Sequence, residues 1–318
     1  MSQQNRLGPA VGGFGSSVRG RVVGILGPAV SVLIAAIFAA VFVSAFAEAE
    51  SAHFHHVRLN VTDPEATMEF YTRVFGATPT RYANSVDALY TERSFILFNV
   101  VDEPPPSALK SGLWHIGWGG IDMPHKYEWL KSQGVKIHTP LYALGSSFVT
   151  YVQGPDDELI EVNTMGHNRF GHVHLFAEDV NETVKWYLEN LGLSARRPHV
   201  PKPDLTRVRA WSNSFRCDNV SIIVYGRPDF TPKPPWWRWE PLTEFEPTEG
   251  RAINHIAFSY PDLKPEIKRM RDNGVTIVKP IGFRYDMNHT SFFVEGPDKV
   301  LIEIVESPSI PEGIWDEE

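Results

Sequence analysis

The chain has one cysteine among its 318 residues, and this scarcity limits the kinds of site that it can build. Cys217 has no second thiol to pair with, so an intramolecular disulfide and a cysteine-rich zinc site are both excluded. Basic residues are also few, since 30 Lys and Arg stand against 38 Asp and Glu without forming a stripe. Nucleic-acid binding depends on clustered cations, so the net charge of -8 argues against a nucleic-acid partner.

Charged residues are missing altogether from residues 22–47, which are nearly all apolar or small. These 26 positions exceed the roughly 20 needed to cross a bilayer and the roughly 7–15 of a signal-peptide core. Arginines precede the run and glutamates follow it, which predicts a cytoplasmic segment at residues 1–21 and an exported remainder. We expect a retained membrane anchor or a cleaved signal peptide, because Ala45 and Ala47 form a cleavage pattern. Both alternatives place the remainder at the periplasmic or extracellular face.

Four similar stretches recur along the rest of the chain. Residues 55–77 match residues 171–193 at a constant offset of 116, and residues 115–137 match residues 255–277 at an offset of 140. Each stretch begins with the alternation of a strand, continues with an Asp at a helix N-cap position, and then shows helical spacing that ends at a glycine. Short strands follow, so the sequence predicts an α+β protein of four repeated modules.

One such module is too small to bury a good core, so we expect the modules to pair. The polar stretch 163–171 indicates a boundary between a first domain at residues 53–165 and a second at residues 170–306, with a tail at 307–318. The order of pairing stays open at this point. The first module could pair with the second within one half, or with the fourth across the halves, in which case the site residues of the two halves would be mixed.

Several of the predicted strands carry a histidine or a glutamate opposite their large apolar residues. His115, for example, shares a face with two glycines, while Ile116 and Trp118 lie on the other face. A sheet with one solvated face would give the same alternation. Each half, however, supplies two histidines and one glutamate at equivalent positions. This gives two candidate metal-binding triads, which are His56, His115 and Glu161 in the first half and His172, His255 and Glu303 in the second.

These residue types suit a divalent metal, because two neutral imidazoles and one carboxylate leave coordination positions open for a substrate. His55 and His174 are competing candidates. At the offset of 116 His55 corresponds to Gly171, and His174 corresponds to Arg58. Neither has a histidine as its counterpart, so His56 and His172 are the preferred ligands.

The motifs HVRLNVTDPEATMEFYTRVFG (residues 56–76) and GPDDELIEV (residues 154–162) resemble those of the vicinal oxygen chelate superfamily. That group includes glyoxalases, bleomycin- and fosfomycin-resistance proteins and type I extradiol dioxygenases. The resemblance covers about residues 53–306. It implies four βαβββ modules paired into two domains, preceded here by one transmembrane or signal helix. It also implies a metal inside each curled sheet and a substrate that chelates the metal through two neighbouring oxygens.

Within this resemblance, an extradiol-type dioxygenase with Fe(II) is the preferred function. Glyoxalases take a fourth ligand from a strand that here contains no acid or histidine, at residues 95–101 and 220–226. The dioxygenases place a tyrosine ten residues before the ligand glutamate, which Tyr151 fits, although packing alone could also explain Tyr151. Their acid–base histidine is absent, and His289 could replace it, although a plain surface position is the commoner fate of such a residue.

Two other classes of function stay open. A lyase, an isomerase or a resistance-type transferase would use Mn, Zn or Ni without dioxygen. A non-catalytic protein would simply hold a small molecule in an apolar cup. The segment PKPPWWRWEP (residues 232–241) is expected to cover a core edge or a contact between copies of the chain, or else to form an aromatic lid with Arg238 available for an anion.

Overall fold

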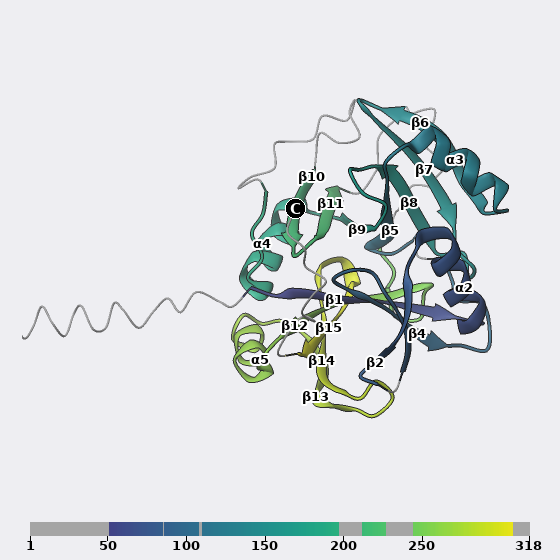
Figure 1. Cartoon of the computed structure of the whole chain (residues 1–318). Coiled ribbons are helices and arrows are strands. Elements are labelled where there is room, and N and C mark those ends of the chain that lie inside the picture. Colours follow the sequence, from purple (N-terminus) through teal and green to yellow (C-terminus); the bar gives the residue numbers. More distant parts are fainter. Residues whose placement is uncertain (1–50, 85, 108–109, 197–211, 227–243, 308–318) are drawn as a thin grey trace, which may run out of the picture. The chain divides into compact units, whose positions relative to one another are not determined.

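The computed structural model describes residues 51–84, 86–107, 110–196, 212–226 and 244–307 (Figure 1). The apolar run at residues 22–47 and the tryptophan-rich segment at 232–241 lie outside these ranges, so the export and lid predictions stay predictions. Within the ranges, no helix combines the length and the apolar character that a membrane crossing requires.

The strands of the described residues form two sheets. The first sheet has eight strands in the order β13 (Ile277–Arg284), β14 (His289–Glu295), β15 (Leu301–Glu306), β12 (Ile253–Tyr260), β1 (His53–Val61), β4 (Phe95–Val100), β3 (Val86–Tyr90) and β2 (Thr78–Tyr82). The second sheet has seven in the order β10 (Ser212–Cys217), β11 (Val220–Gly226), β9 (Phe170–Ala177), β5 (Leu113–Gly120), β8 (Leu159–Thr164), β7 (Ser147–Gln153) and β6 (Lys136–Leu144).

The four α-helices of the described ranges begin where the sequence predicts, at α2 (Pro64–Phe75), α3 (Met123–Ser132), α4 (Val180–Leu191) and α5 (Leu263–Asp272). An aspartate caps each of them, as Asp63 does by accepting a 2.9 Å hydrogen bond from the Ala66 N–H. Gly76 and Gly192 end α2 and α4 with φ values of 69° and 64°, a left-handed conformation that costs glycine little. The repeated α+β modules are therefore confirmed.

The modules pair across the two halves of the sequence. In the first sheet β1 of the first module runs antiparallel to β12 of the fourth, and in the second sheet β5 of the second module runs antiparallel to β9 of the third. The predicted boundary at residues 163–171 is thus a short connection from β8 to β9 within one sheet. A polar, glycine-containing loop marks a chain reversal equally well in both situations, and for this reason composition alone did not separate them.

The strands that carry the histidines are buried on both faces. In each of β5, β9 and β12 all eight residues are buried, so the alternative of a solvated face is wrong. The apolar face packs on the helices as predicted, with the Trp118 ring 4.7 Å from that of Phe75 on α2. The opposite face therefore encloses polar side chains, and buried polar groups need partners among themselves or a bound ion.

Candidate metal centres

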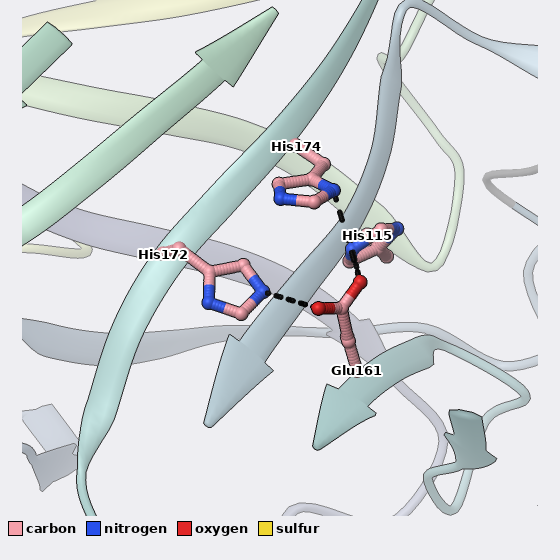
Figure 2. Close-up of side chains that lie close together, drawn as sticks. All are labelled: His115, Glu161, His172 and His174. Carbon is pink, nitrogen blue, oxygen red and sulfur yellow. Dashed lines mark ion pairs between the residues drawn. The ribbon is translucent and has the colours of Figure 1, made fainter. Parts of the chain in front are cut away.

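Four buried side chains converge in the second sheet. They are His115 on β5, Glu161 on β8, and His172 and His174 on β9. One ligand atom from each lies within 4.8 Å of the others, and Figure 2 shows the imidazoles arranged around the carboxylate. We call this group the four-donor cluster.

The Glu161 carboxylate is the centre of the four-donor cluster. Its oxygens lie 3.1 Å from His115 Nε2 and 3.7 Å from His172 Nε2. The Tyr151 hydroxyl donates to Oε2 at 2.7 Å, and the Asn163 amide donates to Oε1 at 2.9 Å. These outer hydrogen bonds fix the carboxylate in one orientation, as the partners of metal ligands usually do. Tyr151 touches Glu161 because the two residues are directly paired between β7 and β8.

Aromatic side chains surround the four-donor cluster. Trp114 stacks on Phe176 at 4.3 Å between ring centroids, and Tyr225 lies 5.0 Å from His174. Such a wall excludes water and strengthens electrostatic interactions between the charged groups inside it.

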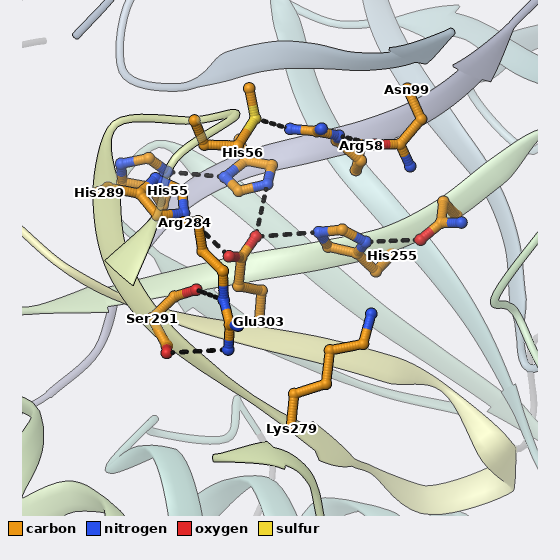
Figure 3. Close-up of polar contacts among 12 residues, drawn as sticks. His55, His56, Arg58, Asn99, His255, Lys279, Arg284, His289, Ser291 and Glu303 are labelled. Carbon is orange, nitrogen blue, oxygen red and sulfur yellow. Dashed lines mark hydrogen bonds and ion pairs between the residues drawn. The ribbon is translucent and has the colours of Figure 1, made fainter. Parts of the chain in front are cut away.

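A second group lies in the first sheet and consists of His56 on β1, His255 on β12 and Glu303 on β15. We call it the three-donor cluster. Glu303 Oε2 lies 3.3 Å from His56 Nε2 and 3.1 Å from His255 Nε2 (Figure 3). The other carboxylate oxygen, Oε1, lies 2.9 Å from His289 Nε2. His289 is thus buried against the cluster, and the expected surface position is wrong.

Hydrogen bonds outside the three-donor cluster fix which nitrogen of each imidazole faces inward. His255 Nδ1 lies 2.7 Å from the Asn254 side-chain oxygen and must donate to it, which leaves the Nε2 lone pair toward Glu303. His56 Nδ1 lies 2.7 Å from His55 Nδ1, so a proton on His56 Nδ1 leaves its Nε2 free as a ligand atom. Three ligand atoms, two Nε2 and one Oε2, therefore point at a common place.

A β-bulge brings His55 into this arrangement. The register between β1 and β12 shifts between Phe54 and His56, so adjacent histidines both reach the inner face. The Tyr82 hydroxyl bridges His289 Nδ1 at 2.8 Å and His55 Nε2 at 3.4 Å. The result is a buried chain of imidazoles and a phenol that ends on Glu303.

Burial sets the protonation states in both clusters. It lowers the pKa values of His115 and His255, and it lowers that of His56 well below the ordinary range. Burial alone would raise the pKa values of Glu161 and Glu303, but the neighbouring imidazoles hold both well below the ordinary range. Neutral imidazoles beside an ionised carboxylate are the forms that bind a divalent metal, so both donor sets fit such an ion.

The three-donor cluster opens into a cavity of about 270 Å³. His255, Glu303 and the aromatic ring of Phe293 line it, together with three basic side chains, Arg58, Lys279 and Arg284. This volume is slightly below the roughly 300–1,000 Å³ of typical ligand pockets, so the cavity suits a small molecule.

The structure regroups the predicted site residues. His56 meets His255 and Glu303, while His115 and Glu161 meet His172, so the triads drawn within each half of the sequence are wrong. The reason is the pairing across halves, which was the open alternative. Tyr151 and His289 contact different clusters. Sequence comparison of the halves set His174 aside, although its position two residues after His172 places it on the same strand face.

Comparison with known proteins agrees with this architecture. Glyoxalase I from Zea mays superposes with a TM-score of 0.61 at 17% identity, over 80% of this chain and 92% of that one. A candidate dioxygenase from Bacillus subtilis gives 0.55 at 14% identity, over 85% and 89%. At such identities the likeness shows the fold alone. A comparison with curated sequences finds no match. The family model described as Glyoxalase/Bleomycin resistance protein/Dioxygenase superfamily matches residues 53–162 and 169–304, and the chain belongs to this superfamily.

Proposed function

We propose that the protein is a metal-dependent enzyme that acts on a small molecule with neighbouring oxygens, and that the three-donor cluster is its reaction centre. Dioxygen-dependent oxygenation with Fe(II) is the preferred reaction. The observation that carries the proposal is the convergence of His56 Nε2, His255 Nε2 and Glu303 Oε2 beside a cavity. Two histidines and one carboxylate are typical of non-haem Fe(II) oxygenases, because they leave positions open for substrate and dioxygen.

The chain's own residues supply the remaining functions. A bound metal would act as a Lewis acid that polarises the substrate oxygens. His289 donates from Nε2 to Glu303 Oε1 and accepts at Nδ1 from the Tyr82 hydroxyl, so its imidazole can hold a proton at the edge of the cluster. This position between Tyr82 and Glu303 in the series of hydrogen bonds makes His289 the candidate acid–base group of the reaction.

A lyase or isomerase is the second candidate. The buried chain of His55, Tyr82 and His289 favours it, because enolisation needs proton transfer and no dioxygen. Zn, Ni or Mn at the same three-donor cluster would then serve. A protein that only binds a small molecule is the third candidate.

Anaerobic purification of the full chain, followed by reloading with Fe(II) or Zn, tests these alternatives. Oxygen uptake and ring-cleaved product from a panel of catechols with Fe(II), and neither with Zn, are expected for the oxygenase. Conversion of 2-oxoaldehydes in the Zn form without dioxygen supports the second candidate and contradicts the first.

His255→Ala and His115→Ala form a matched pair for the same assay. We expect His255→Ala to abolish turnover, since it removes a ligand of the three-donor cluster. His115→Ala should retain turnover because its cluster lies in the other sheet. Ligand binding without turnover in any metal form, and unaltered by either change, would leave the binding protein as the remaining candidate.

A further inference from the structure

We propose that the cavity beside the three-donor cluster selects organic anions, and that Arg58 binds the carboxylate of the substrate. This assignment rests on the proposed function of the same cluster, since it names the class of substrate, but it is tested by binding without turnover.

Arg58 is a buried cation beside the candidate metal ligands. It lies on β1 directly opposite His255 on β12, and only 5% of its surface is exposed. Paired residues of antiparallel strands project on the same face with Cβ atoms about 5 Å apart. The guanidinium therefore lies next to the place where substrate oxygens would meet a metal, and it lines the cavity.

The protein satisfies this guanidinium only in part. Its Nε–H donates to Asn99 Oδ1 at 2.7 Å, and a terminal nitrogen contacts the sulfur of Met287, which is a weak acceptor. The other terminal nitrogen lies 3.9 Å from Asp286, beyond hydrogen-bond distance. The Asp286 side chain is 72% exposed, so water screens its charge. Among the described residues, no carboxylate forms a bidentate pair with Arg58.

A row of asparagines holds Arg58 in place. Asn99 donates to Asn60 at 2.9 Å, Asn254 lies 3.4 Å from the same Asn60 oxygen, and Asn254 in turn accepts from His255. The network thus connects the guanidinium to a candidate metal ligand through neutral amides. Figure 3 shows its first bond, from Arg58 to Asn99. A buried arginine held by neutral partners keeps its full charge for a ligand, and its planar donor array matches a carboxylate.

The four-donor cluster has a histidine, not an arginine, at the position that corresponds to Arg58. His174 faces His115 there at the register where Arg58 faces His255. One sheet thus carries an additional metal donor and the other a cation at the same position of the module. Two further cations, Lys279 and Arg284, lie over the Phe293 ring at 4.7 Å and 5.4 Å from its centroid.

Without a metal, the charges of the six charged residues that line the cavity cancel. Arg58, Lys279 and Arg284 give three positive charges, and Glu249, Asp286 and Glu303 give three negative charges. A divalent ion at the cluster would add two positive charges and leave the lining with a net charge of +2. An anionic ligand reduces this excess of positive charge, and the Phe293 ring favours an aromatic or other planar body. A small aromatic carboxylate with vicinal oxygens fits these features best.

The test compares 3,4-dihydroxybenzoate with 4-methylcatechol, which has similar size and no carboxylate. Binding to the full chain loaded with Zn is measured by calorimetry without dioxygen. We expect the carboxylate to bind roughly tenfold to a hundredfold more tightly, as charge-assisted hydrogen bonds allow. Arg58→Met should remove this preference and leave 4-methylcatechol binding unchanged. Arg216→Met, at an exposed position of β10, is the matched control and should change neither affinity.

Asn99→Asp is the second variant and is decisive if Arg58→Met does not fold. It keeps Arg58 but places a carboxylate against its Nε, so the anion preference should also disappear. Equal affinities for the two probes in the unaltered chain, or a preference that survives both substitutions, would overturn the assignment. Retained preference without any oxygen uptake would reject the oxygenase and leave the anion site in place. Oxygen uptake without the preference for the carboxylate would support the oxygenase and reject the anion site.

Discussion

Gly117 lies directly opposite His172 across β5 and β9, and a Cβ atom added at Gly117 would overlap the His172 imidazole. The imidazole reaches the four-donor cluster by lying over the neighbouring strand, where only a hydrogen atom leaves room. Ala257 holds the equivalent place opposite His56 in the first sheet. The small residues that alternate with apolar ones along these strands thus make space for the metal-binding side chains.

Gly117→Ala should therefore displace His172 and weaken metal binding at the four-donor cluster. Its methyl group meets the ring itself, with no flexible chain end to give way. We expect zinc affinity at this cluster to fall by about 10–100-fold, as when a partner that positions a ligand is lost. The measurement is zinc titration of the full chain. Gly166→Ala is the control because its added Cβ meets no atom within 4 Å, and equal affinities in the two variants would refute the role of Gly117.

The local structure could be predicted from the sequence because short-range rules decide it. Asp63 and Asp179 cap helices in the structure as their spacing predicted, and Gly76 and Gly192 end them. The positions of the histidines and glutamates on the inner strand faces also followed from the alternation of residues. Each of these features depends on neighbours within a few positions of the chain.

The long-range arrangement could not be predicted in the same way. His56 and His255 meet through the pairing of β1 with β12, and the alternation of residues along a strand does not specify which strand lies beside it. His55 reaches the inner face only through the bulge in β1, which the sequence does not mark. His174 was set aside because its counterpart is Arg58, yet this difference is what distinguishes the two sites.

The pairing across halves predicts how metal content responds to paired substitutions. We expect the full chain to bind two zinc ions, one in each cluster. His56→Ala combined with Glu303→Gln should lose one of the two ions, because both residues belong to the three-donor cluster. His56→Ala combined with Glu161→Gln should lose both. Metal analysis of the purified variants decides, and the reverse outcome would support sites built within each half of the sequence.

A buried carboxylate away from both clusters should make stability depend on pH. Burial raises the pKa of Glu158 from 4.5 to about 7, although Tyr71 donates a 2.7 Å hydrogen bond to it. The folded pKa exceeds the unfolded one, so the native state retains a proton between these values. The stability gained from this proton is fully present below pH 4.5 and is lost as the pH rises through 7.

Glu158→Gln should remove this loss. Between pH 4.5 and pH 8 the free energy of unfolding of the unaltered chain should fall by about 3 kcal/mol relative to the variant. Denaturant titrations of both proteins at several pH values measure the difference. Glu69→Gln, at an exposed position of α2, is the control and should show no comparable change. A difference that is constant with pH would mean that Glu158 is ionised in the folded protein throughout.

Tyr151 and His289 contact the glutamates of different clusters, and replacing each of them locates the reaction. Tyr151 donates to Glu161 at 2.7 Å, whereas Phe293 occupies the paired position opposite Glu303 and has no hydroxyl to donate. If the three-donor cluster is the reaction centre, Tyr151→Phe should leave kcat unchanged and only reduce metal affinity at the four-donor cluster.

His289→Gln should instead lower kcat by about 100-fold or more, the usual contribution of an acid–base group. It should also flatten one limb of the pH–rate profile, which a purely structural role would leave in place. Metal content at the three-donor cluster serves as the control for intact ligands, since His289 is outside the set of His56, His255 and Glu303. A large loss of kcat in Tyr151→Phe together with normal turnover in His289→Gln would transfer the reaction to the four-donor cluster. There Tyr151, whose hydroxyl donates to Glu161, would become the candidate proton donor.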